Sequence, residues 1–174
     1  MALEDIGALL LRVILGVLFL SCVWGCSKDA TARQNAVAAT ALVFKRRPEL
    51  FASASVLLAA AGALSFLLGV FPRLGALAMV IYLVPATMVH FAMQRESLVL
   101  QAKILRETNG KIDVATTSDV SALGATAAFG HMTEGLKNLF LIAPAAYLVL
   151  AGGRPPMLIG FGPDWKLQGL LTQL

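Results

Sequence analysis

Eight polar residues that fall near one end of the expected helices have side chains that could form hydrogen bonds or relay a proton. They are Trp24, Cys26, Lys28, Glu49, His90, His131, Lys137 and Asn138. A histidine and a carboxylate that lie close together can hydrogen-bond the headgroup of a quinone and exchange protons with it. This chemistry predicts a quinone-headgroup cluster, with the isoprenoid tail between helices, made of Trp24, Glu49, His90, Lys137 and Asn138.

Two other interpretations of these residues stay open. Lys, Trp and Glu are common at the ends of membrane helices, where they serve as interface anchors. His90 and His131 could instead be the two axial ligands of a haem. We expect His131 in a loop rich in Gly and Ala, however, and haem ligands are generally held by rigid elements. Cys22 and Cys26 have the spacing of packing residues rather than of a redox dithiol, and no metal site is predicted.

The apolar segments that must position these side chains have the length of membrane helices. Hydrophobic residues make up 58% of the chain and charged residues only 14%, whereas soluble proteins have roughly 25% charged residues. A hydrocarbon core of about 30 Å requires about 20 apolar residues per helix, and these runs lack the alternation of barrel strands. We therefore expect an all-α fold, an integral membrane four-helix bundle forming one domain over residues 1–174, with helices at about 6–25, 50–70, 74–93 and 136–151.

Two polar connections separate these helices. The first, at 27–49, is expected to lie at the membrane interface. The second, at 94–135, contains Asn109-Gly110 between two short runs of β-compatible residues. Asn-Gly is a strong signal of a tight hairpin turn, so we expect a small β-hairpin there. A lone hairpin is marginal in water, which indicates that it rests on another surface.

The distribution of basic residues predicts how the chain sits in the membrane. The face of the two long connections carries ten of them: Lys28, Arg33, Lys45, Arg46, Arg47, Arg95, Lys103, Arg106, Lys111 and Lys137. The opposite face carries Arg12, Arg73, Arg154 and Lys166. By the positive-inside rule both termini lie outside, in a bacterial inner (plasma) membrane or alternatively in an organellar energy-transducing membrane. The charge pattern does not indicate binding to nucleic acid, since no basic patch is interleaved with aromatic residues.

Several longer motifs resemble the DoxX family of small four-helix membrane proteins. They are LLLRVILGVLFL, the WG before Lys28, LLGVFPRLGALAMVIYLVPATMVHF and LKNLFLIAPAAYLVLAGG. The resemblance covers most of residues 8 to 153. Carried over position by position, it marks Arg12, Gly25, Lys28, Glu49, Gly69, Arg73, His90, Lys137 and Asn138.

The resemblance implies a quinone-linked role in a respiratory redox system. Two features depart from the family pattern. Val23 stands where a polar residue often precedes the glycine of the first helix, which argues against catalysis. The connection at 94–135 is longer than usual, which favours a docking surface.

These observations predict an accessory subunit of a larger, quinone-linked membrane redox complex, serving in assembly, anchoring or docking. Its expected partners are membrane lipid and other integral membrane subunits, and it is not expected to be an enzyme on its own. A quinone is the candidate cofactor, and bound lipid is expected between the helices. The alternatives are a self-contained quinone-reactive protein and a small-solute carrier, although the helices lack the midplane charges and broken-helix pairs typical of a carrier.

Overall fold

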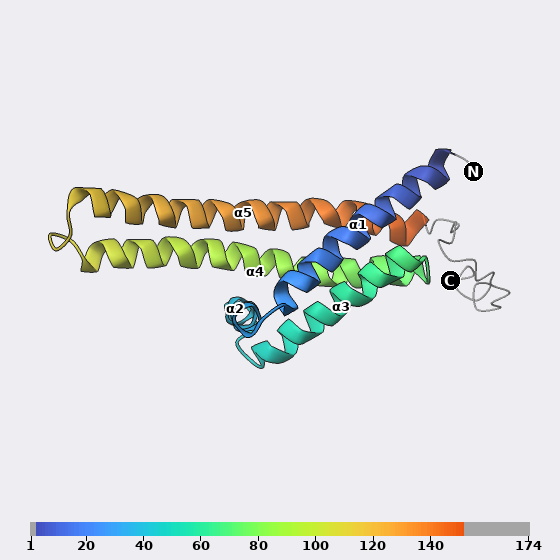
Figure 1. The fold of residues 1–174 in the computed structure, drawn as a ribbon, viewed down its shortest axis with the longest axis horizontal. Helices are drawn as coiled ribbons and strands as arrows, with labels where there is room; N and C mark the ends of the chain where they lie inside the picture. Colours follow the sequence, from blue (N-terminus) through green and yellow to red (C-terminus); the bar gives the residue numbers. More distant parts are fainter. Residues whose placement is uncertain (1–2, 152–174) are drawn as a thin grey trace.

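The computed structural model describes residues 3–151, and all regular secondary structure in this part of the chain is helical (Figure 1). The helices are α1 (Leu3–Ser27), α2 (Ala30–Ala41), α3 (Pro48–Leu68), α4 (Pro72–Glu107) and α5 (Val114–Ala151). The predicted all-α class is therefore confirmed. The expectations for Arg154 and Lys166, and the end of the predicted domain, lie outside the described residues.

Three helices are long and apolar enough to cross a membrane. They are Leu9–Ser27 within α1, Pro48–Leu68 and Pro72–Glu107, at the places of the first three expected spans. The fourth expected span, at 136–151, is the last part of α5, which is not among these three. The four-helix membrane bundle therefore stays a prediction.

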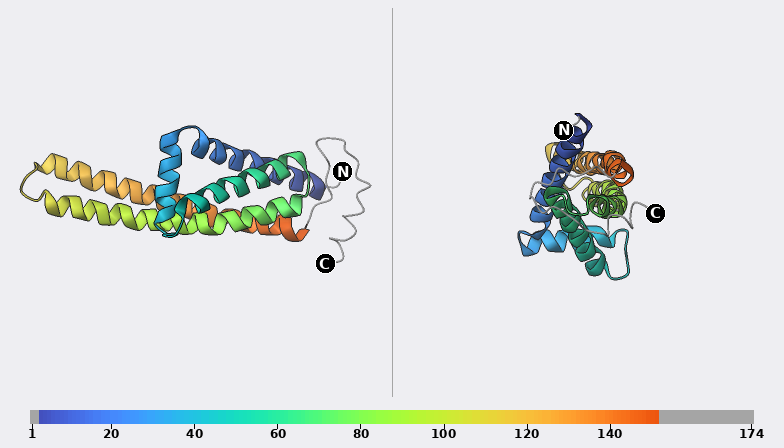
Figure 2. Two further views of the ribbon diagram at one scale, coloured as in Figure 1. Left: turned by 90° about the horizontal axis from the view of Figure 1, so that it is seen from below. Right: turned by 90° about the vertical axis from the view of Figure 1, so that its right-hand side faces the viewer.

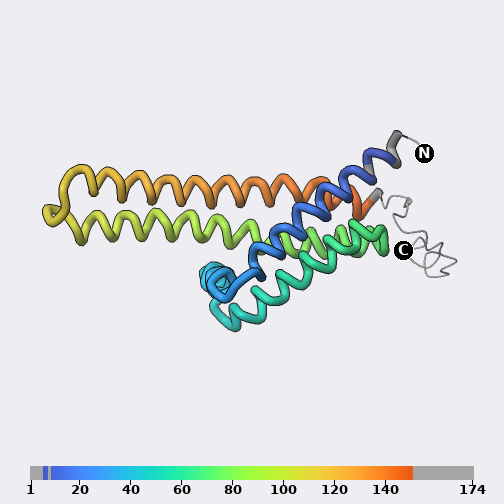
Figure 3. Tube along the Cα trace, in the orientation of Figure 1, coloured from blue at the N-terminus to red at the C-terminus, as the bar shows by residue number. Residues whose placement is uncertain are grey.

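The polar connection expected at 94–135 is wrong in form, because most of it belongs to two long helices. α4 continues without a break to Glu107, and α5 begins at Val114. The two helices run side by side and antiparallel, well beyond the ends of α1 and α3 (Figure 3). We call the part formed by residues 94–135 the helical hairpin.

The β-hairpin expected around Asn109-Gly110 is likewise wrong, since residues 94–135 contain no strand. Gly110 lies in the short turn between the helices with φ of 71°, a left-handed conformation that glycine adopts readily. Asn-Gly therefore serves a helix–helix turn here. Helices also satisfy their own backbone groups, and the Gln101 amide adds a hydrogen bond of 2.9 Å to the carbonyl oxygen of Ser121 across the pair.

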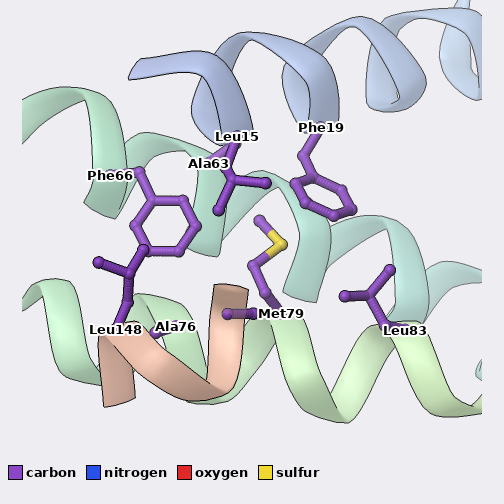
Figure 4. Close-up of a cluster of buried hydrophobic side chains, with 9 residues drawn as sticks. Leu15, Phe19, Ala63, Phe66, Ala76, Met79, Leu83 and Leu148 are labelled. Atoms are coloured by element: carbon purple, nitrogen blue, oxygen red, sulfur yellow. The ribbon is translucent and has the colours of Figure 1, made fainter. Parts of the chain in front are cut away.

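The core is shared by the four long helices and is built from apolar side chains of mixed size (Figure 4). Its buried members are Leu15, Phe19, Ala63, Phe66, Ala76, Met79, Leu83, Ala145 and Leu148. Phe19 of α1 also meets the ring of Tyr82 of α4 edge to face, with ring centroids 5.8 Å apart. Because lipid tails are as apolar as these side chains, close packing rather than escape from water holds such a core together.

α3 and α4 approach closely where glycines face one another. A Cβ atom on Gly62 would lie 3.0 Å from the carbonyl oxygen of Gly75. Next to this contact, the hydroxyl of Ser65 lies 2.6 Å from the carbonyl oxygen of Val70 and 3.0 Å from that of Phe71. The glycines and the serine thus tie the end of α3 to the start of α4.

α2 lies across the long axis of the molecule, in contrast to the other helices (Figure 2). The carboxylate of Asp29 caps its first turn by accepting a hydrogen bond of 2.6 Å from the amide of Ala32. After α2, the ring of Phe44 stacks on that of Phe51 of α3 with centroids 4.5 Å apart. These contacts fix α2 at one end of α1 and α3.

The α4–α5 pair has two further local features. Pro85 lies inside α4 and Pro144 inside α5, without interrupting either helix. At the start of α5, the Asp113 carboxylate accepts a hydrogen bond of 2.7 Å from the amide of Thr116. This bond lowers the pKa of Asp113, because it stabilises the charged form.

Candidate functional site

His90 of α4 and His131 of α5 face each other across the helix pair. Their ring centroids are 6.2 Å apart and their planes are inclined by 39°. Within residues 3–151, Nδ1 of His90 is buried without a hydrogen-bond partner. The expectation that His131 lies in a loop is wrong, since it lies within α5. Two imidazole rings held on packed helices, one with a free buried nitrogen, form a polar site in apolar surroundings.

α5 adds three polar residues next to His131. Glu134 and Lys137 form an ion pair one helical turn apart, and their side chains are 48% and 42% exposed. Asn138 is only 7% exposed. His131, Glu134 and Asn138 share one face of α5 through their spacing of three and four residues. Glu134 is the carboxylate that acts electrostatically on His90, together with His131 and Lys137.

The end of α1 brings two thiols to the same region. Cys22 and Cys26 are both half-buried and unpaired. Cys22 lies within electrostatic range of Lys137 and Glu134. Tyr82 of α4 lies within the same range of both cysteines. The polar site therefore has contributions from α1, α4 and α5.

Two other predicted members of the cluster, Glu49 and Trp24, are exposed near helix ends. Glu49 is exposed in the first turn of α3, and it is not among the charged groups that act on His90. Trp24 is 75% exposed near the end of α1. The structure therefore brings His90 together with the helix of Lys137 and Asn138, but it provides Glu134 where the sequence indicated Glu49.

Sequence reasoning overlooked Glu134 and left His131 out of the five residues predicted for the headgroup cluster. Both were assigned to a loop, where spacing carries no information about neighbours. The signal that could have found them is helical spacing, which places Glu134 and Asn138 three and seven residues after His131, close to one face of α5.

The remaining residues marked by the family resemblance lie outside the polar site, at helix ends or in helix contacts. Arg12 is 1% exposed, and its Nη2 donates to the carbonyl oxygen of Phe66 at 3.4 Å, in the last turn of α3. Gly69 ends α3 in the left-handed conformation, with φ of 71°. Lys28 and Arg73 are exposed, and no neighbouring atom would hinder a Cβ on Gly25.

A haem does not fit between the two histidines. α4 and α5 pack directly on either side of them, since a Cβ on Gly124 would lie 2.7 Å from Gln101 and one on Gly135 would lie 3.2 Å from Phe91. A macrocycle between the rings would have to separate the helices. No group of three or more His, Cys, Asp or Glu residues in the described part of the chain gathers to hold a metal ion.

Three apolar helices of membrane-spanning length, with a shared core and a polar site among them, define an integral membrane protein. Residues 7–92 match the model of the DoxX family, which confirms the resemblance to that family over this stretch. The matched residues include most of α1, all of α2 and α3, and the first part of α4 with His90. Comparisons with curated proteins and with solved structures found no match.

Proposed function

We propose that this chain is an accessory subunit of a quinone-linked membrane redox complex, which it anchors in the membrane and docks through the helical hairpin. The length of the α4–α5 pair carries this proposal. α4 has 36 residues, which at about 1.5 Å per residue gives about 54 Å. A hydrocarbon core is about 30 Å thick. About 24 Å of paired helix therefore extends beyond the hydrocarbon core. A rigid pair of helices of this length can present a surface to a partner subunit.

The surface of the helical hairpin supports contact with a partner. Large apolar side chains are exposed on both helices, including Val99 at 61%, Leu123 at 71% and Phe129 at 62%. Beyond the hydrocarbon core these side chains would face water in an isolated chain. Several large exposed apolar side chains on one water-facing element favour a protein contact.

A deletion that preserves the helix pairing tests the docking role. Gln101 pairs with Ser121, so replacing residues 98–125 with a short Gly-Ser turn removes opposite segments of both helices. We expect the shortened chain to insert into the membrane and to lose its co-purifying partner subunits. The variant Val99→Ser with Leu123→Ser should weaken the association, while the matched control Ala102→Ser with Ala127→Ser should not. Full retention of partners by the shortened chain would contradict the docking role.

The polar site supports the quinone link and a second candidate function, a self-contained quinone-reactive membrane protein. His90, His131 and Glu134 provide donors and acceptors for a headgroup in apolar surroundings. Binding of a short-chain quinone to the purified chain tests this. We expect His90→Ala and Glu134→Gln to weaken binding at least tenfold and the control Glu49→Gln to leave it unchanged. Unchanged affinity in His90→Ala would remove His90 from the site.

We also propose that α5 crosses the membrane and that both chain termini lie outside, in a bacterial inner membrane or an organellar equivalent. α5 runs beside α4, and its buried Ala145 and Leu148 belong to the same core as the membrane-length helices. The tip of the helical hairpin then lies on the inner side. A single cysteine at Asn109 in a cysteine-free background should react with a membrane-impermeant maleimide only in inside-out vesicles. Labelling in right-side-out vesicles would contradict this orientation and indicate that both termini lie inside.

A further inference from the structure

The two ends of α2 carry exposed positive charge. Lys28 and Arg33 lie at its beginning, and Lys45, Arg46 and Arg47 follow its end. All five side chains are exposed. α2 has 12 residues and is therefore about 18 Å long. We call α2 with these five residues the basic crossbar.

Nearby acidic groups do not neutralise this charge. Among the described residues the one ion pair joins Lys137 to Glu134, both on α5. Two carboxylates, Asp29 and Glu49, lie next to the five basic residues in the sequence, so the segment from Lys28 to Glu49 keeps a net charge of +3. Arg33 donates to the carbonyl oxygen of Ser27 at 3.2 Å, which holds its charge beside the end of α1. The basic crossbar is thus available to an anionic partner.

The position of the basic crossbar indicates which partner that is. The membrane-length stretch of α1 ends at Ser27, and that of α3 begins at Pro48, so the crossbar lies at one boundary of the hydrocarbon core. α2 also lies across the long axis of the other helices, which places it along the membrane surface (Figure 2). The anions present at this depth are lipid phosphates.

Apolar and aromatic side chains beside the crossbar complete the match. Trp24 is 75% exposed, Leu50 58% and Phe51 43%, all within about one turn of the ends of α1 and α3. Side chains of this kind suit the boundary where a headgroup meets its acyl chains. A phospholipid with a net negative headgroup complements both parts of this surface.

We propose that the basic crossbar is a binding surface for anionic phospholipids, with Lys28, Lys45 and Arg46 contacting the headgroups and Trp24 contacting the acyl chains. Clustered basic residues next to membrane helices recognise anionic headgroups through summed electrostatic attraction, at about fivefold in affinity per charge. The surface uses none of the side chains of His90, His131 and Glu134 and none of the helical hairpin. It therefore does not rest on the proposed function.

Fluorescence quenching by brominated lipids tests this surface. The chain has two tryptophans, so the Trp165→Phe background leaves Trp24 as the reporter. This protein is reconstituted into vesicles that contain either brominated phosphatidylglycerol or brominated phosphatidylcholine, each diluted with unbrominated lipid of the other kind. We expect the anionic lipid to quench Trp24 preferentially, with a relative affinity of at least fivefold, and we expect salt to reduce this preference.

Two variants with equal charge removed separate the outcomes. Lys28→Gln with Lys45→Gln and Arg46→Gln should abolish the preference. The matched control, Lys103→Gln with Arg106→Gln and Lys111→Gln in the helical hairpin, should keep it. Equal quenching by both lipids in the unaltered crossbar, or an undiminished preference in the crossbar variant, overturns the proposal. Competition by millimolar inorganic phosphate would also overturn it, since the surface would then be a site for free phosphate.

Discussion

Replacing Gly75 with alanine should weaken the contact between α3 and α4. The new Cβ would lie 2.6 Å from Cβ of Ser65, and Ser65 would have to move away from the turn carbonyls it bonds. Overpacking costs about 1–3 kcal/mol, and the lost hydrogen bond costs about 0.5–1.5 kcal/mol. Alanine regains about 0.5–1 kcal/mol of helix stability relative to glycine. The net loss in the free energy of unfolding should be about 2 kcal/mol.

A matched glycine separates this effect from helix propensity. Gly130 of α5 has no neighbouring atom within 4 Å of an added Cβ. Gly130→Ala should therefore stabilise the protein by about 0.5–1 kcal/mol. The assay is unfolding by increasing SDS in mixed micelles, followed by circular dichroism, with each free energy compared with that of the unaltered chain.

The pair Ser65→Gly with Gly75→Ala tests the cause. This exchange moves the small residue to the other helix and relieves the contact. The double variant should be more stable than the sum of the single effects predicts, by at least about 1 kcal/mol. Additive effects, or a stabilising Gly75→Ala, would refute the assignment of this contact to Ser65.

Three further changes have expected outcomes. Arg12→Ala should lower the free energy of unfolding by about 2–4 kcal/mol in the same assay, because it removes a buried side chain and its bond to Phe66; Arg12→Lys should recover part of the loss. Leu83→Ala should cost about 2–5 kcal/mol, since Leu83 is fully buried in the core. The lowered pKa of Asp113 means that its charged form stabilises the fold: the contribution is present above the ordinary aspartate pKa of about 3.9 and is lost as the pH falls through the lower folded value. Carboxyl NMR titration should place the Asp113 pKa below that of an unstructured peptide, and Asp113→Ala should increase amide exchange in the first turn of α5.

Composition and run length were enough to predict the membrane-length helices, because a bilayer leaves few ways to satisfy a long apolar backbone. They were not enough for residues 94–135. This segment is polar enough for water and contains Asn109-Gly110, a pair that fits a strand turn and a helix turn equally well. The choice between them depends on the helix lying opposite, as the bond from Gln101 to Ser121 shows.

The candidate site was predicted in part for the same reason. His90 was identified because it is an ionisable residue inside an apolar run, and Lys137 because it opens another. Glu49 was chosen as their carboxylate from its depth in the expected topology. The depth of a residue in the membrane does not specify which side of its helix faces the site. In the structure Glu134 of α5, rather than Glu49, lies within electrostatic range of His90.

The two prolines of the α4–α5 pair determine where this pair can bend. Pro85 leaves the carbonyl of Ile81 without its helical donor, and Pro144 does the same to Phe140. By the pairing of Gln101 with Ser121, these two gaps lie at nearly the same height. Both helices therefore lack one backbone hydrogen bond near the same plane, inside the membrane-facing half, while the described hairpin beyond it contains no proline. Bending of the pair would cost least at that plane.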